Sequence, residues 1–513
     1  MSNALSRDLS KLVRAVEAEA PARGRWRQHL HLCPPTGWLN DPNGLCQLDG
    51  EFHAFFQYAP FDAEGGLKLW GHCVSDDLLR WRYLGAPLLA DQPFDCHGVY
   101  SGSAVVEDGC MRVLYTGNVK REDADYDYVN DGREANTVLV ESVDGGRTFG
   151  RKHVVMTNAD YPADDTCHVR DPKVWRAGSA GGSSGASPRY LMVQGARRRA
   201  DADEPSVPSR YCAAFGERAG VDRGEVLVFG SDDLRSWHLA RRVSTPERFG
   251  FMWECPDYFE LADASAGDAS PAHVLSVSPQ GLEGGDWDRR NVYQSGYFLL
   301  DGPLLEAGAP QPGHFRLWDA GFDFYAPQTF EAADGRRVLI GWMGMPDEPA
   351  HTNRTLEDDW QHCLTVPREV TWEGGVVCQR PVRELEALRG GLRRAAWTLD
   401  AETSEAFDLV VEGVGEFLRV RLCRELELAW SAGEGWLELG FSRSGRASVG
   451  AGRAVRREPL AELRDVRIVA DASSVEVFAN DGELVMSTRY YPETYSVSVD
   501  APGAEVRLWG LEA

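Results

Sequence analysis

The chain has 513 residues, with 54 basic and 79 acidic side chains, a formal charge of −25 and a pI near 4.9. So acidic a surface repels nucleic-acid phosphates and anionic membranes, which argues against both as partners and favours a small neutral molecule as ligand. At this length we expect two to four domains and a sizeable core.

The eleven cysteines are scattered along the chain without a Cys-x-x-Cys pair. Their odd number and wide spacing favour free thiols in a reducing compartment over a disulfide framework or a zinc site. Residues 1–20 lack the apolar core of a signal peptide, and no apolar run is long enough to span a bilayer. We therefore expect a cytoplasmic protein.

The first 24 residues are expected to form a helical extension. Residues 5–20 carry apolar side chains at spacings of three and four, which predicts an amphipathic helix on the body of the protein, and Pro21 follows it. The apolar positions are Leu5, Leu9, Leu12, Val13 and Val16.

From Trp26 onward, short apolar-aromatic runs alternate with Gly, Asp and Pro, which is typical of an all-β architecture. One fragment recurs in it: residues 75–81 (SDDLLRW) are echoed by 231–237 (SDDLRSW) and, more loosely, by 142–149. In each copy a strand ends at Ser, Asp begins a turn and an aromatic opens the next strand. Such repeats predict a β-propeller, which we place at residues 25–365 as the catalytic domain.

The pattern of apolar and polar residues changes again near residue 366. We expect a linker over 366–394 and a β-sandwich over 395–513, where apolar and polar residues alternate over short spans. Residues 178–187 and 200–209 look like surface insertions because they are low in complexity or rich in acids and proline.

The stretch from His31 to Gly44 (HLCPPTGWLNDPNG) holds the first candidate catalytic group, Asp41. Pro42 restricts the backbone before it and the following Asn-Gly closes a tight turn, so Asp41 is expected at a strand end with a fixed side-chain direction. A carboxylate held in this way suits a nucleophile, although an isolated Asp-Pro-Asn-Gly is more simply a structural turn.

Two further acids have unusual neighbours. In Arg170-Asp171-Pro172 the adjacent guanidinium should keep Asp171 ionised, whereas in Trp253-Glu254-Cys255-Pro256 the indole and thiol should raise the pKa of Glu254 by desolvation. Opposite environments of this kind are what glycoside cleavage requires. A Mg²⁺ or Ca²⁺ site is the competing explanation, but its ligands are commonly clustered in the sequence and these are not, so we expect neither metal nor cofactor.

Six ordered motifs resemble the signature blocks of glycoside hydrolase family 32, the β-fructofuranosidases, which include invertases, sucrose-6-phosphate hydrolases, and exo-acting inulinases and levanases. The resemblance runs from about Arg25 to Pro492, and one departure is Tyr100, where the family usually has Phe. The motifs are residues 31–44, WGHCVSDDLLRW at 70–81, YSGS at 100–103, RDPKV at 170–174, WECPDYF at 253–259 and DFYAPQTF at 323–330.

The resemblance implies a five-bladed β-propeller followed by a β-sandwich, and a retaining mechanism in the central funnel. Asp41 would be the nucleophile, Glu254 the acid and then the base, and Asp171 the transition-state stabiliser. Residues similar to the family's fructose pocket are Asn40, Gln57, Trp70, Ser101, Arg170, Tyr325 and Trp342. The alternative for Trp70 and Trp342 is a place in the propeller core, and for Gln57 it is a polar strand position without a binding role.

The expected function is hydrolysis of the terminal β-D-fructofuranosyl unit of sucrose, sucrose 6-phosphate or short fructo-oligosaccharides. The alternatives are a fructosyltransferase, a related five-bladed arabinan or xylan hydrolase, and a carbohydrate-binding protein that has lost activity. The sequence leaves open whether the sugar is neutral or phosphorylated, and whether the chain forms a homo-oligomer.

Overall fold

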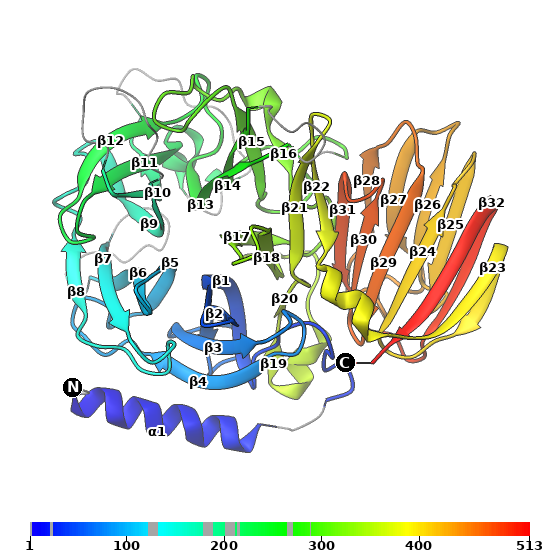
Figure 1. Ribbon diagram of the computed structural model, residues 1–513, viewed down its shortest axis with the longest axis horizontal. Helices are drawn as coiled ribbons and strands as arrows, with labels where there is room; N and C mark the ends of the chain where they lie inside the picture. Colours follow the sequence, from blue (N-terminus) through cyan, green and yellow to red (C-terminus); the bar gives the residue numbers. More distant parts are fainter. Residues whose placement is uncertain are drawn as a thin grey trace.

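The computed structural model describes residues 3–20, 24–121, 132–177, 188–200, 211–212, 216–263, 270–287 and 289–512. In this part of the chain the strands form six sheets: five are arranged in a ring, and a ten-stranded sheet lies beside it (Figure 1). The predicted insertion at 178–187, and all of the second except its first residue, lie outside the described residues.

The ring is a five-bladed propeller, as predicted, and the first strand of each blade lies nearest the centre (Figure 1). Blade one contains β1 (Gly37–Leu48), β2 (Glu51–Ala59), β3 (Leu69–Ser75) and β4 (Arg82–Leu88). Blade two contains β5 (Val99–Glu107), β6 (Cys110–Lys120), β7 (Arg133–Ser142) and β8 (His153–Met156). Blade three contains β9 (Asp165–Arg176), β10 (Tyr190–Arg198), β11 (Arg223–Ser231) and β12 (His238–Val243).

Blade four contains β13 (Met252–Leu261), β14 (Ala272–Gln280), β15 (Gly296–Leu300) and β16 (Arg316–Leu317). Blade five contains β17 (Tyr325–Glu331), β18 (Arg337–Met343), β21 (Arg368–Glu373) and β22 (Val376–Pro381). The 3₁₀ turns are η1 (Glu217–Gly220), η2 (Pro312–His314), η3 (Arg354–Asp358) and η4 (Arg383–Leu388).

The repeated fragments lie between the third and fourth strands of the first three blades. In each turn the Asp accepts a hydrogen bond from the hydroxyl of the Ser two residues earlier, at 2.8–3.2 Å. These pairs are Ser75–Asp77, Ser142–Asp144 and Ser231–Asp233. The repeat therefore marks one equivalent turn of the blade, as the propeller prediction required.

The last blade is interrupted by an excursion that closes the ring. Between β18 and β21 the chain forms β19 (Trp360–Gln361), which pairs in parallel with β1, and β20 (Cys363–Leu364), which pairs with β18. Backbone hydrogen bonds thus join the fifth blade to the first.

The segment 366–394, which we expected to be a linker, is largely structured. It contains β21 and β22, which continue the fifth blade outward from β18. A Gly374-Gly375 turn with positive φ at both residues joins these two short strands, and that pair was the hairpin signal that the linker interpretation overlooked. The domain limits 1–24, 25–365 and 395–513 stay a prediction.

The C-terminal strands form the predicted β-sandwich. The long β32 pairs with β25 through residues 497–500 and with β24 through 505–510, so it passes from one layer to the other. Apolar side chains from both layers, such as Leu409, Val420 and Ile468, meet in one core. The strands are β23 (Arg389–Glu402), β24 (Phe407–Glu412), β25 (Phe417–Leu422), β26 (Leu426–Ser431), β27 (Trp436–Phe441), β28 (Val455–Pro459), β29 (Asp465–Asp471), β30 (Ser474–Ala479), β31 (Leu484–Arg489) and β32 (Ser496–Leu511).

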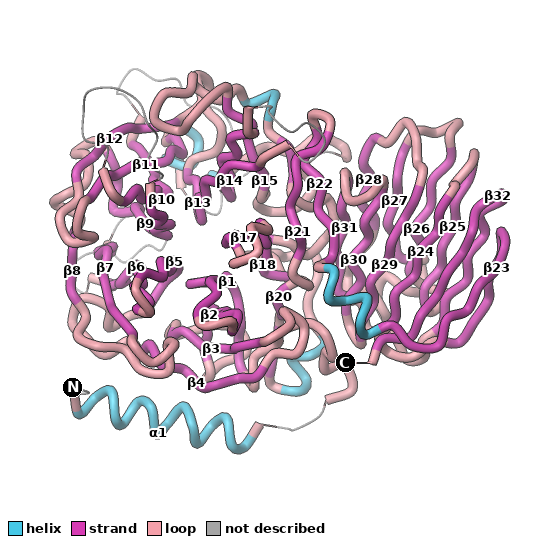
Figure 2. Tube along the Cα trace, in the orientation of Figure 1, coloured by secondary structure: helices cyan, strands magenta, loops and turns pink. Residues whose placement is uncertain are grey.

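The predicted N-terminal helix is α1 (Ala4–Glu19). It runs along the outside of the first blade, beside β4 (Figure 2, helix in cyan and strands in magenta). The Asn3 side chain caps it by accepting the N–H of Ser6, and Leu9 and Val13 are buried. None of the helices in the described ranges is long and apolar enough to cross a membrane.

A buried charge cluster joins the propeller to the sandwich. The His31 imidazole lies 2.9 Å from both Asp471 and Glu476 on the sandwich, and Arg368 on β21 donates to Glu476 at 2.6 Å. Burial alone would lower the pKa of His31, but the hydrogen bonds to the two carboxylates raise it to about 10. Burial would raise the pKa of Asp471, but the hydrogen bond with His31 lowers it to about 2.

Replacing His31 by Leu should lower the free energy of unfolding by about 3–5 kcal/mol at pH 6, because the buried Asp471 loses its cation and Glu476 keeps only Arg368. Because the pKa of His31 is raised by folding, its contribution is complete below about pH 6.5 and disappears as the pH rises through about 10. Thermal unfolding of wild type and variant between pH 6 and pH 10.5 measures this. The exposed control His29→Gln should change stability by less than about 0.5 kcal/mol, and an equal loss in both variants would contradict the account.

Candidate active site

Each of the five inner strands has a β-bulge, one extra residue relative to its neighbour, at the position of a predicted site residue. The register shifts fall between Leu39 and Pro42 on β1, Tyr100 and Gly102 on β5, Arg170 and Lys173 on β9, Glu254 and Asp257 on β13, and Tyr325 and Gln328 on β17. A regular strand turns successive side chains to opposite faces, and a bulge lets two consecutive ones face the same side. The bulges therefore gather polar side chains at the centre of the ring.

The Asp41 carboxylate is held by two amide donors and one hydroxyl donor. Asn40 donates to one of its oxygens at 3.1 Å, while Gln57 at 3.2 Å and the Ser101 hydroxyl donate to the other. Burial raises the pKa of Asp41 above its ordinary value, against the opposing effect of the hydrogen bonds from Ser101 and Asn40. Asp41 lies inside β1 at the bulge and not at a strand end, since the predicted Asp-Pro-Asn-Gly turn is part of the continuous strand.

Asp171 faces Asp41 across the Cys255 thiol. The sulfur lies 3.6 Å from an oxygen of each acid, and the backbone N–H of Cys255 donates to Asp171 at 3.0 Å. Cys255 adopts φ 45° at this bulge, and its side chain faces these acids. We expected Arg170 to keep Asp171 ionised, but burial raises the pKa of Asp171 to about 7, with Arg170 opposing and Glu254 and Asp41 adding to the increase.

The Arg170 guanidinium instead binds Glu254. It donates to one Glu254 oxygen at 2.6 and 3.1 Å, and its Nε lies 3.9 Å from Asp171. The other Glu254 oxygen accepts from Tyr325 at 2.6 Å and from Gln280 at 2.8 Å. The expected apolar surroundings of Glu254 are therefore absent, because strand alternation turns the neighbouring indole of Trp253 into the opposite core.

All three acids line one cavity of about 500 Å³. Of the predicted binding residues, Asn40, Gln57, Arg170, Tyr325 and Trp342 also line it. Its other lining residues are Trp38, Glu64, Gly65, Gly66, Leu67, Lys68, His97, Tyr100, Lys120, Gln280, Pro346 and Asp347. A buried arginine, four tryptophan or tyrosine rings and several carboxylates are suited to binding a polyhydroxylated ligand through directional hydrogen bonds.

Two protein-family models together match most of the chain. The model described as Glycosyl hydrolases family 32 N-terminal domain matches residues 31–184 and 194–381, and the model described as Glycosyl hydrolases family 32 C terminal matches residues 388–507. The chain belongs to glycosyl hydrolase family 32. It is a glycoside hydrolase, as the sequence motifs predicted.

Relatives of this family 32 enzyme match it over most of its length. It is 34% identical to sucrose-6-phosphate hydrolase of Bacillus subtilis, with 94% of each chain covered, and 35% identical to raffinose invertase of Escherichia coli, with 98% and 99% covered. Among solved structures, sucrose-6-phosphate hydrolase of Lactobacillus gasseri matches with a TM-score of 0.80 at 26% identity, covering 98% and 96%. A Bombyx mori β-fructofuranosidase mutant in complex with sucrose matches with a TM-score of 0.78 at 26% identity, covering 100% and 99%.

Two predicted binding residues of the family 32 enzyme lie behind the cavity wall. Trp70 is fully buried and donates its indole N–H to the backbone carbonyl of Tyr100, so it supports the wall without lining it. Ser101 contacts Asp41 and Gln57 and also lies outside the lining. Trp342 lines the cavity but is only 2% exposed, and its ring packs edge-on against Trp38.

Sequence reasoning missed Cys255 as a contact of the acids, and it missed Gln280, Lys68 and Asp347 in the lining. A signal for Cys255 was present. The bulges on β1, β9, β13 and β17 share an X-X-Pro pattern, so the middle residue of Glu254-Cys255-Pro256 is equivalent to Asp41 on β1 and to Asp171 on β9. The four triplets are Asn40-Asp41-Pro42, Arg170-Asp171-Pro172, Glu254-Cys255-Pro256 and Tyr325-Ala326-Pro327. Gln280 stands on β14 outside any motif, and only the pairing of β13 with β14 brings it near Glu254.

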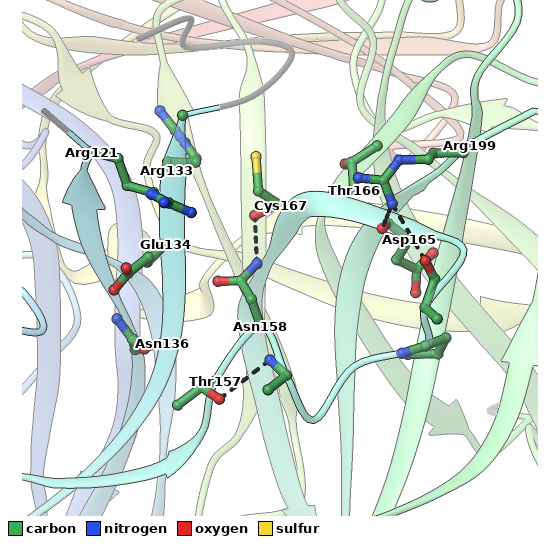
Figure 3. Close-up of a pocket in the computed structure, with 14 residues that line it drawn as sticks. Arg121, Arg133, Glu134, Asn136, Thr157, Asn158, Asp165, Thr166, Cys167 and Arg199 are labelled. Atoms are coloured by element: carbon green, nitrogen blue, oxygen red, sulfur yellow. Dashed lines mark hydrogen bonds between the residues drawn. The ribbon is translucent and has the colours of Figure 1, made fainter. Parts of the chain in front are cut away.

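A second cavity, of about 700 Å³, lies beside β7 and the start of β9 (Figure 3). Its polar side chains are largely engaged with the chain itself: Asn158 donates to the Cys167 carbonyl and Arg199 to that of Asp165. None of the predicted site residues lines it.

Replacing Asp171 by Asn should stabilise the family 32 enzyme at pH 8 by about 1–3 kcal/mol, because the native state no longer has to bury that charge. Folding raises the pKa of this acid, so ionisation costs the native state stability as the pH rises from about 4 to about 7. The gain should therefore shrink toward pH 4.5. Chemical unfolding at both pH values measures it, with the exposed turn variant Asp108→Asn as control. If Asp171→Asn were less stable than the wild type at pH 8, burial of the ionised Asp171 carboxylate would not be destabilising, which would contradict the account.

Proposed function

We propose that this enzyme is a retaining β-fructofuranosidase that hydrolyses the terminal β-D-fructofuranosyl unit of sucrose, sucrose 6-phosphate or short fructo-oligosaccharides. The observation that carries the proposal is the convergence of Asp41, Asp171 and Glu254 in one cavity from three different blades. The names of its relatives, among them sucrose-6-phosphate hydrolases and a raffinose invertase, support this substrate class.

Asp41 is the proposed nucleophile. Attack on the anomeric C2 forms a covalent fructosyl-enzyme ester, and the bond to the departing sugar oxygen breaks. The donors Asn40, Gln57 and Ser101 fix the carboxylate, so little reorganisation is needed when the reaction begins. The hydrogen bonds from these three side chains also keep the carboxylate competent as an anion in a buried site.

Glu254 is the proposed general acid and base. It gives a proton to the departing oxygen in the first step and takes one from water in the second, while Tyr325 and Gln280 hold one of its oxygens. Asp171, which accepts a hydrogen bond from the Cys255 N–H, is the proposed transition-state stabiliser: it would bind fructose hydroxyls and stabilise the oxocarbenium-like transition state. Neither a metal nor a cofactor is needed for these steps.

A fructosyltransferase is the second candidate, since it uses the same intermediate and passes fructose to a sugar instead of water. An inverting arabinan or xylan hydrolase predicts a different anomeric outcome, so product stereochemistry separates it from the first proposal. We also infer a cytoplasmic location, which the eleven free thiols support. The oligomeric state stays open.

Asp41→Asn should lower kcat on sucrose at least about 10³-fold, and Glu254→Gln about 10²–10⁴-fold, because each removes a group that acts in the transition state. Both rates are measured by fructose release. The matched control is Asp49→Asn, which alters an exposed turn acid at the far end of β1 and should leave kcat within about twofold.

Stereochemistry provides the complementary measurement. With methanol present, the wild-type enzyme should form methyl β-D-fructofuranoside, because two displacements at C2 retain the configuration. An α product, or full turnover by Asp41→Asn, would contradict the proposal.

A further inference from the structure

The cavity carries basic side chains on one part of its wall. Lys68, His97 and Lys120 line it together with the carboxylates. The guanidinium of Arg170 is already bound to Glu254. Lys68 and His97 come from neighbouring segments, because the N–H of Val99 donates to the carbonyl of Lys68 at 2.8 Å.

The Lys68 ammonium lies 4.6 Å from the centre of the Trp38 ring. Within the described ranges it makes neither a hydrogen bond nor an ion pair, so its three N–H donors are available to a ligand. Burial lowers the pKa of Lys68 to about 7, although the charges of Asp41 and Asp62 oppose this shift. An anion bound beside it would favour the charged form.

His97 presents a second donor. Its Nδ1 accepts the backbone N–H of Lys120 at 2.9 Å, which leaves the ring proton on Nε2. Among the described residues no hydrogen bond to that Nε2 occurs, and the ring lines the cavity. A cationic amine and an imidazole N–H from adjacent segments form a donor set suited to the oxygens of a phosphomonoester.

We propose that Lys68 and His97 are specificity-determining residues that bind the phosphate of a phosphorylated disaccharide in this cavity. The inference rests on the proposed function and adds the recognition of an anionic substrate to it. The enzyme carries a charge of −25 and its cavity contains Asp41, Asp171, Glu254 and Asp347, so an anion is repelled unless cations at the wall offset that field.

The test compares sucrose 6-phosphate with sucrose as substrates of the full-length enzyme. In Lys68→Gln and in His97→Gln, the ratio of kcat/KM for the phosphorylated sugar to that for sucrose should fall about tenfold to hundredfold, the size expected for one charge-assisted hydrogen bond. Lys68→Arg keeps the charge and should retain the ratio within about threefold. The matched control Lys11→Gln removes an exposed lysine from α1 and should leave the ratio unchanged.

Product inhibition shows which sugar unit carries the recognised phosphate. Glucose 6-phosphate and fructose 6-phosphate are compared with glucose and fructose as inhibitors of wild type and of Lys68→Gln. We expect at least one phosphorylated sugar to inhibit the wild type about tenfold more strongly than its neutral counterpart. In Lys68→Gln the two sugars should inhibit equally.

Two results overturn the inference while leaving the proposed function intact: equal losses on both substrates in Lys68→Gln and His97→Gln, which indicate contacts with hydroxyls, or kcat/KM values that are unchanged on both substrates in both variants. Wild-type enzyme that cleaves neither sugar overturns the proposed function, and the inference with it.

Discussion

A β-strand turns alternate side chains to opposite faces, so neighbouring residues on an inner propeller strand cannot both face the centre while the ladder stays regular. The extra residue on each of the five inner strands removes that restriction. Asn40 and Asp41 both take part in the site, as do Arg170 and Asp171, and as do Glu254 and Cys255. The polar site depends on these bulges, because without them one residue of each of these pairs would face away from the centre.

The sandwich stabilises the geometry of the last inner strand. Asp323 lies two residues before Tyr325. Its carboxylate accepts hydrogen bonds from the guanidinium of Arg453 at 2.7 Å and from the backbone N–H of Arg489 at 2.8 Å. Both arginines belong to the sandwich domain, so the segment that leads into β17 is fixed from outside the propeller. Tyr325 in turn donates to Glu254, which links the packing between the domains to the position of the proposed acid.

Much of this organisation could be predicted from the sequence, because the informative residues are local. A proline one or two residues after each acid indicated constrained backbone, and the repeated Ser-Asp turns indicated propeller blades; the three acids do line one cavity. The partners of each acid could not be predicted in the same way. Adjacency in the sequence placed Trp253 beside Glu254 and Arg170 beside Asp171, but pleat and bulge separate the first pair and turn Arg170 to Glu254. Gln280 and Lys68 are far from the acids in the sequence and come close to them only in the folded structure.

The most direct test of the account is to trap the intermediate on the proposed nucleophile. In Glu254→Gln the ester formed in the first step should persist, because no base activates water for the second. Rapid acid quenching after mixing this variant with a fructosyl donor that has a good leaving group, followed by proteolysis and mass spectrometry, should find one hexosyl group on the peptide that contains Asp41. A hexosyl group on any other residue, or turnover without an adduct, would contradict the account.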